Sequence, residues 1–170
     1  MKTAIVIYDK INLLSFAQIW QMFSADLRSN VKICAFKSEI VDEHGLKISP
    51  EIYGESLYGY DCVIVPDGMG ALGLRYDEIF LSWIKSASSA RHKIAFDLGA
   101  LIYAGAGFLE GKKACVRAGY KNALKEYCEF DPSPVCISDD IITVCSFGAE
   151  FDVNVCTMEN LKTLKGILNL

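Results

Sequence analysis

The chain has 170 residues, of which 52% are hydrophobic and 22% charged, and its formal net charge is −4. This length is enough for one domain with a sizeable core, and the composition is that of a globular protein. The longest basic feature is Lys112-Lys113, so the clustered cations that bind nucleic acid or an acidic membrane are missing, and we expect neither partner.

Predicted strands alternate with predicted helices along the chain. Short apolar runs rich in β-branched residues indicate strands, and longer periodic stretches indicate helices. The predicted strands cover 3–8, 31–36, 62–66, 93–96, 113–116, 135–138 and 141–145, and the predicted helices cover 13–28, 78–88, 100–107 and 149–170. This alternation predicts an α/β fold, a flavodoxin-like three-layer sandwich with a mainly parallel central sheet, in one domain over 1–170.

Seven cysteines are scattered along the chain without a C-x-x-C pair. An odd, unpaired set argues against a disulfide framework or a zinc site and predicts a reducing, cytoplasmic compartment. The two histidines, His44 and His92, have no metal-ligand partner at useful spacing, so we expect no metal and no cofactor. No stretch approaches the roughly 18 apolar residues that a membrane span needs.

The end of the third predicted strand carries a glycine-rich sequence. Gly68, Gly70 and Gly73 complete a G-x-G-x-x-G pattern, but this is not the first strand and no ribose-binding acid follows at the expected distance. We therefore do not expect a nucleotide. Such a turn can instead direct backbone N–H groups, here those of Gly68 and Met69, at an anionic oxygen, as an oxyanion hole does.

The end of the fourth predicted strand reads Ala95-Phe96-Asp97-Leu98-Gly99. A polar residue flanked by small residues at this spacing is typical of a sharp strand-to-helix elbow, which projects its central side chain into a cleft. Asp97 is thus the candidate functional residue. The simpler alternative is that Asp97 is only the N-cap of the following helix.

Five segments in order resemble the ThiJ/PfpI superfamily, and within it the isonitrile hydratase branch. They are the opening strand and helix (4–8, 14–16 and Phe23), a G-L-x-I-x-P hairpin (44–50), a V-P-G-G-x-G-like turn (65–70), the elbow helix and its continuation (99–114), and a closing I-T…G…(I/F)-D segment (142–152). The resemblance implies a cleft at the elbow and a homodimer, often formed through the first helix, where Phe16, Ile19, Trp20 and Phe23 are candidates for the interface or the core.

The departures from the family pattern fall on its reactive residues. The resemblance places the family's nucleophilic cysteine at Asp97, its acidic partner at Ser15, and the histidine that follows the cysteine in many members at Leu98. A histidine of the hydratase branch falls at Arg117. The first glycine of V-P-G-G is Asp67. Thiolate chemistry needs a cysteine of low pKa beside a carboxyl group, and neither is present at these positions.

Two interpretations of the function follow. In the first, the protein has lost the cysteine-dependent activity and acts as a small-molecule-binding or regulatory protein, with Gly68, Met69, Leu98, Ser15 and Arg117 lining its cleft. Here Asp97 and Arg117 are expected to form an ion pair in place of the lost catalytic pair. In the second, a hydrolase or hydratase uses Asp97 as nucleophile, and the Gly68 and Met69 amides form its oxyanion hole.

Overall fold

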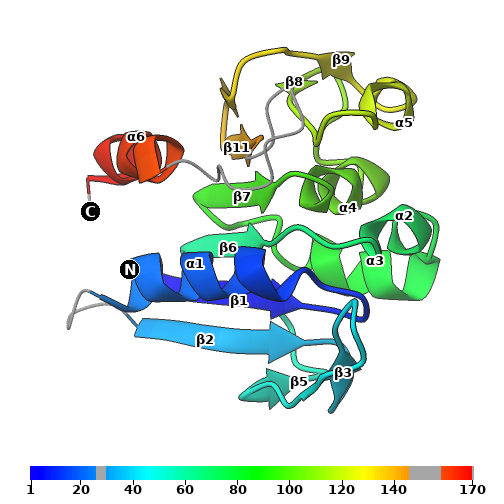
Figure 1. Ribbon diagram of the computed structural model, residues 1–170, viewed down its shortest axis with the longest axis vertical. Helices are drawn as coiled ribbons and strands as arrows, with labels where there is room; N and C mark the ends of the chain where they lie inside the picture. Colours follow the sequence, from blue (N-terminus) through cyan, green and yellow to red (C-terminus); the bar gives the residue numbers. More distant parts are fainter. Residues whose placement is uncertain (26–29, 146–157, 170) are drawn as a thin grey trace.

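The computed structural model describes residues 1–25, 30–145 and 158–169 of the chain. Its largest element is a seven-stranded sheet with the strand order β10-β11-β7-β6-β1-β2-β5 (Figure 1). The strands are β1 (Lys2–Ile7), β2 (Asn30–Ala35), β5 (Ile52–Tyr53), β6 (Cys62–Val65), β7 (His92–Phe96), β10 (Val135–Ser138) and β11 (Ile141–Val144). All neighbouring strands are parallel except β10 and β11, which form an antiparallel hairpin. The predicted flavodoxin-like α/β sandwich is confirmed.

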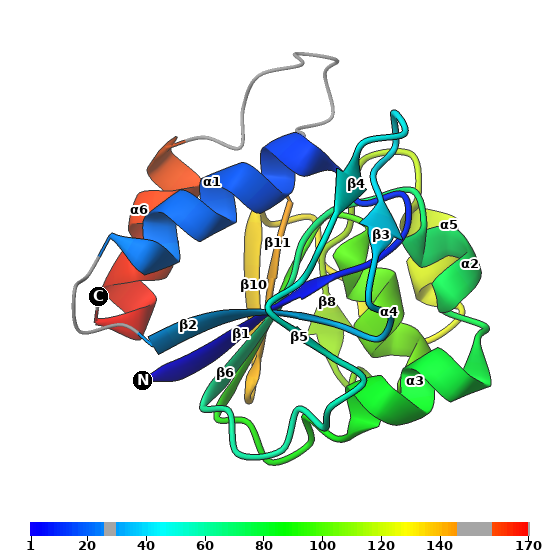
Figure 2. The same cartoon turned by 90° about the horizontal axis from the view of Figure 1, so that it is seen from below.

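Helices cover both faces of this sheet (Figure 2). On one face lie α1 (Leu13–Ser24) and α6 (Met158–Leu168), and on the other lie α3 (Glu78–Lys85) and α4 (Gly99–Gly105). Two further helices, α2 (Ala71–Leu74) and α5 (Lys121–Lys125), are short. None of the helices in these described ranges is long and apolar enough to cross a membrane.

The side chains of the strands divide between two cores, as expected for a sheet buried on both faces. In β1, Ile5 packs with Ile19 and Phe23 of α1. Its neighbours Ala4 and Val6 belong to the opposite core, which includes residues of α3 and α4. Ile19 and Phe23 are thus core residues, whereas Trp20 keeps 36% of its surface exposed.

The sequence predictions differ from the structure mainly at short elements. The strand predicted over 113–116 is β8 (Lys113–Ala114), which pairs with β9 (Glu129–Phe130) in a separate sheet. The hairpin of β3 (Ile40–Val41) and β4 (Lys47–Ile48) forms another small sheet. The first helix is described as far as Ser24, and residues 26–28 of its predicted range lie outside the described residues. The same holds for residues 149–157 of the last predicted helix.

Candidate functional site

The candidate site lies at the carboxyl ends of β1, β6 and β7, where ligands bind in open parallel sheets. Asp97 follows β7 directly and is 1% exposed. Its φ of +51° lies in the left-handed region, which a residue with a side chain adopts at a cost. The backbone amide of Asp97 donates to the carbonyl of Val144 in β11, 2.8 Å away, which holds the turn against the sheet.

The small residue after Asp97 is required by its surroundings. A Cβ atom at Gly99 would lie 2.6 Å from the carbonyl oxygens of Val65 and Pro66, so only glycine fits beside the end of β6. The N-cap of α4 is Leu98, which makes no side-chain cap, and the alternative that Asp97 is that N-cap is wrong. The predicted elbow is therefore present, with Asp97 at its strained position.

The glycine-rich turn after β6 packs tightly against the residues that follow β1. A Cβ atom at Gly70 would lie 1.9 Å from the carbonyl oxygen of Asp9, and one at Gly68 would lie 2.6 Å from that of Lys10. Gly73 has open space around it. Two of the three glycines in the G-x-G-x-x-G pattern therefore serve this close backbone approach.

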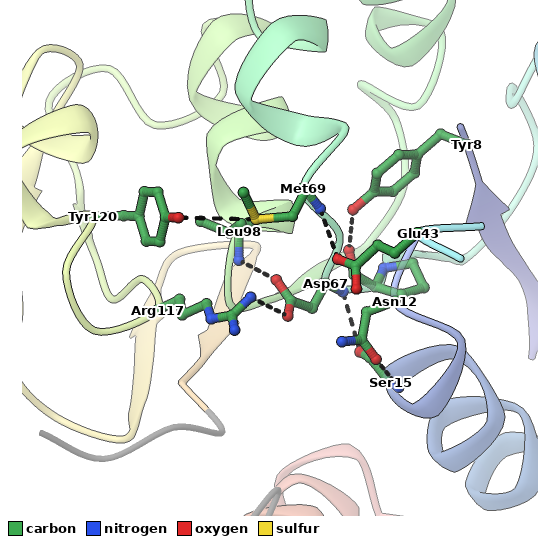
Figure 3. A network of polar contacts seen from close by, with 10 residues as sticks. Tyr8, Asn12, Ser15, Glu43, Asp67, Met69, Leu98, Arg117 and Tyr120 are labelled. Carbon is green, nitrogen blue, oxygen red and sulfur yellow. Dashed lines mark hydrogen bonds and ion pairs between the residues drawn. The ribbon is translucent and has the colours of Figure 1, made fainter. Parts of the chain in front are cut away.

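Asp67 is the centre of the polar network at this site (Figure 3). Its side chain is completely buried. One carboxylate oxygen, Oδ1, accepts a hydrogen bond from the Leu98 amide at 3.0 Å, and the other, Oδ2, lies 3.4 Å from Nη1 of Arg117. The Asp67 amide donates to Oγ of Ser15 at 3.1 Å, and the Asp67 carbonyl accepts from the amide of Asn12 at 2.8 Å.

The pKa of Asp67 is raised by burial, against which the backbone amides of Leu98 and Gly68 and the Arg117 guanidinium favour the ionised form. Glu43, in the turn between β3 and β4, raises it further. These two amides and the Arg117 guanidinium thus stabilise the ionised form of Asp67 at a buried position.

A second carboxylate reaches the same turn from the β3–β4 hairpin. Oε1 of Glu43 accepts a hydrogen bond from the Met69 amide at 3.1 Å. The hairpin is fixed by Asp42, whose Oδ1 accepts from the amides of His44 and Leu46 at 2.9 and 2.7 Å. The Met69 side chain, 39% exposed, has its sulfur 3.8 Å from the hydroxyl of Tyr120.

Tyr8 closes the network on the side of β1. Its hydroxyl donates to the Pro66 carbonyl at 2.6 Å, and its pKa is raised well above the usual value by burial and then by Asp67, Glu43 and Asp97. Three carboxyl groups therefore surround a hydroxyl that stays protonated. The described residues contain no cluster of side chains suited to hold a metal ion.

The sequence interpretation brought most of these residues together but missed three of them. Ser15, Met69, Leu98 and Arg117 all contact this network, and their role in binding a ligand stays a prediction. The contact described for the Arg117 side chain is with Asp67, and its pairing with Asp97 stays a prediction. Asp67, Glu43 and Tyr8 were not among the expected site residues. For Asp67 a signal existed, since its carboxylate replaces the first glycine of the V-P-G-G pattern.

Comparisons with known proteins agree on one family. The model of the DJ-1/PfpI family matches residues 1–160. An isonitrile hydratase from Pseudomonas putida is 33% identical over 86 residues, a match that spans 50% of this chain and only 38% of that enzyme. A ThiJ/PfpI family protein from Pseudomonas syringae has a similar structure with a TM-score of 0.80 at 19% identity, over 99% of this chain and 74% of that one. DJ-1 from Schizosaccharomyces pombe aligns over the full length of both chains with a TM-score of 0.72 at 15% identity.

Proposed function

The chain belongs to the DJ-1/PfpI family, and from this premise we propose that it is a member without covalent chemistry that acts as a small-molecule-binding or regulatory protein. One observation carries the proposal: two backbone amides that could stabilise a developing oxyanion, that of the residue after Asp97 at the elbow and that of Met69, hold the chain's own carboxylates. The Leu98 amide is bonded to Asp67 and the Met69 amide to Glu43.

An oxyanion hole works because its donors point at the place where negative charge develops during the reaction. Here that place already holds negative charge. A substrate carbonyl that polarised at this position would have to displace Asp67, which is fully buried and fixed by its amide, its carbonyl and both carboxylate oxygens. Transition-state stabilisation by the Leu98 amide is therefore lost.

The nucleophile position supports the same proposal. An aspartate has no thiolate to attack with, and the family's acidic partner position holds Ser15, whose hydroxyl oxygen accepts a hydrogen bond from the Asp67 amide. The strained φ of Asp97 does favour a second candidate, an enzyme in which Asp97 attacks an electrophile. That candidate needs a base to activate water for hydrolysis of the ester intermediate, and the two carboxylates described beside Asp97, those of Asp67 and Glu43, are bonded to backbone amides.

An activity screen distinguishes the two candidates. Purified protein is incubated with isonitriles, esters, amides and 2-oxoaldehydes, beside Asp97→Asn and beside Asp131→Asn, a matched control outside the polar network of the site. We expect no turnover above that of the Asp97→Asn variant with any substrate. Turnover that Asp97→Asn abolishes and Asp131→Asn preserves would establish the enzyme and end the non-catalytic proposal.

We further propose that the protein is a homodimer in which α1 takes part. Its support is the exposed apolar surface that Leu14 and Trp20 leave on this helix, 59% and 36% exposed. Sedimentation measurements of the wild type and of Trp20→Ser test it: a dimer that the substitution weakens is the expected result, and a wild-type monomer at high concentration contradicts it.

A further inference from the structure

A cavity lies beside the candidate site, at the carboxyl ends of β1 and β2. Its volume is about 290 Å³. Six of its lining residues are largely apolar, namely Ile7, Tyr8, Phe36, Ile40, Leu74 and Phe80, and three are charged, namely Asp9, Lys37 and Asp77. We call it the β1–β2 pocket. A mainly apolar cavity with a few polar groups, at this edge of a parallel sheet, has the character of a ligand site.

The walls of the pocket are held by contacts among the lining residues and with the core. Ile7 and Ile40 are core residues with 0% and 2% of their surface exposed. Phe80 is 3% exposed and packs edge-to-face against Phe36, with ring centroids 6.3 Å apart, and against Trp83 at 5.7 Å. Because these rings are held by their neighbours, the cavity is preformed rather than made by a ligand.

The volume and the aromatic walls limit the size and shape of the occupant. An apolar cavity of about 150 Å³ holds one benzene molecule. The β1–β2 pocket has roughly twice that volume, which suits a bicyclic aromatic ring with a short side chain. Phe36 and Phe80 offer aromatic faces and edges for such a ring.

The charged lining residues determine the polar end of the occupant. Asp9 forms an ion pair with Lys37 and accepts a hydrogen bond from the Val41 amide at 3.0 Å. Asp77 caps α3 through Oδ1, which accepts from the amides of Ile79 and Phe80 at 3.1 and 3.0 Å. The lining thus carries two carboxylates and one ammonium group, and that ammonium group is already paired with Asp9. The remaining negative charge favours a cationic group.

We propose that the β1–β2 pocket binds a small aromatic amine, with its ring between the apolar walls and its ammonium group near Asp77 and Asp9. The binding would be reported to the candidate site through Tyr8, whose ring lines the pocket while its hydroxyl holds the Pro66 carbonyl in the network of Figure 3. The pocket proposal thus gives the proposed small-molecule role a location and a ligand class. It rests on the proposed function only for its biological meaning.

Titrations of ¹⁵N-labelled protein with tryptamine, indole and indole-3-acetate test the proposal. We expect saturable shifts at the amides of the lining residues, with a dissociation constant of about 1 mM or tighter for tryptamine. Tryptamine should bind about two- to fivefold more tightly than indole, the range for exposed charge pairs, and indole-3-acetate should bind most weakly. Shifts at Asp67 and Met69 would follow through Tyr8.

Three variants make the result specific. Leu74→Phe fills the pocket and should abolish the shifts; Ile40→Phe is a second filling variant should the first lose its native spectrum. Asp77→Asn keeps an acceptor for the α3 cap and should weaken tryptamine about two- to fivefold. Asp131→Asn removes the same charge from a loop residue outside the pocket lining, whose Oδ1 accepts from the Ser133 amide at 2.8 Å, and should change nothing.

Some outcomes would overturn the proposal. These are the absence of saturable shifts, shifts that persist in a folded filling variant, and tighter binding of indole-3-acetate than of tryptamine. The activity screen is independent of this experiment. Turnover through Asp97 combined with amine binding would end the non-catalytic proposal and leave the pocket proposal standing. No turnover and no amine binding would end the pocket proposal and leave the non-catalytic proposal standing.

Discussion

The two ends of strand β7 each bury a charged side chain, but they treat it differently. At the amino end, Lys93 is 1% exposed and donates to the Ala90 carbonyl at 3.0 Å and to Asp140. Asp140 also accepts from Lys112 at 2.8 Å, and the Lys93 ammonium lies 5.2 Å from the ring centroid of Phe108. Lys93 and Lys112 share the Asp140 carboxylate there, and Lys112 also lies 3.7 Å from the carboxylate of Asp139, whose φ of +55° belongs to the turn between β10 and β11.

At the carboxyl end of β7, carboxyl groups outnumber the cation that is described beside them. Asp67 is buried with Arg117 as its cation, Glu43 and Asp97 add two more carboxyl groups, and Asp97 holds a strained backbone angle. Burial raises the pKa of Asp67, whereas at Asp140 the hydrogen bonds from Lys112 and Lys93 outweigh burial and lower the pKa. The difference teaches that the amino end contributes to stability, while the carboxyl end keeps an arrangement that stability alone would not select.

The largest effect should come from the close backbone approach at the carboxyl end. Gly70→Ala places a Cβ atom against the Asp9 carbonyl and should lower the free energy of unfolding by about 3 kcal/mol or more. Gly73→Ala is the matched control, because open space surrounds that residue within α2, and it should be neutral or stabilising by up to about 1 kcal/mol. Urea unfolding of both variants measures this, and equal losses would show that the turn is not tightly packed.

At the amino end, removing the carboxylate should cost more than removing the lysine. Asp140→Asn leaves the buried Lys93 ammonium without its counter-charge and should lower the free energy of unfolding by about 2–3 kcal/mol. Lys93→Met removes the buried charge itself and leaves Asp140 paired with Lys112, so its effect should stay within about 1 kcal/mol. The comparison between the two ends fails if urea unfolding shows that Lys93→Met lowers the free energy of unfolding by more than Asp140→Asn does.

The strain at Asp97 can be separated from the role of its carboxylate. Asp97→Ala and Asp97→Gly both remove the side-chain charge, but only glycine adopts a φ of +51° without strain. The glycine variant should therefore be more stable than the alanine variant by about 1 kcal/mol in thermal or urea unfolding. Equal stability would mean that the turn relaxes and that the elbow is not over-determined by its neighbours.

Much of the fold could be read from the sequence because its signals are local. The apolar runs that correspond to β1, β6 and β7 are buried on both faces of the sheet. The small residues around Asp97 predicted the elbow. The partner of a short strand is not a local property, and so β8 was not separated from the main sheet. The elements α2 and α5 are too short to show a helical period.

The position of the site was predictable, but its hydrogen-bond partners were not. The ends of β6 and β7 were expected to meet because neighbouring parallel strands end at one edge of a sheet. Asp67 and Leu98, 31 residues apart, and Met69 and Glu43, 26 apart, bond through a backbone amide and a side chain. Residue type does not reveal which amide a carboxylate will reach. The sequence therefore predicted the Gly68 and Met69 amides as free oxyanion donors, whereas the structure has the Met69 amide bonded to Glu43.

The smallest effect, and the one that tests the contrast most directly, is the pH dependence of the two ends. Asp67 has a raised pKa in the folded protein, so the folded state holds its proton more tightly than the unfolded state. Its contribution to stability should therefore fall as the pH rises from the unfolded pKa through the folded one, and then stay constant. Asp140 has a lowered pKa, so its contribution is present above the unfolded pKa and is lost as the pH falls through the folded value.

Urea unfolding of the wild type, Asp67→Asn and Asp140→Asn between about pH 3 and pH 8 separates these contributions. The free energy of unfolding of the wild type relative to Asp67→Asn should fall with rising pH, by about 1.4 kcal/mol for each pH unit that separates the folded and unfolded pKa values of Asp67. The difference between wild type and Asp140→Asn should move the opposite way at the acidic end. If both differences moved in the same direction, Asp67 would be as well stabilised as Asp140, and the carboxyl end would have to be regarded as a second structural ion pair.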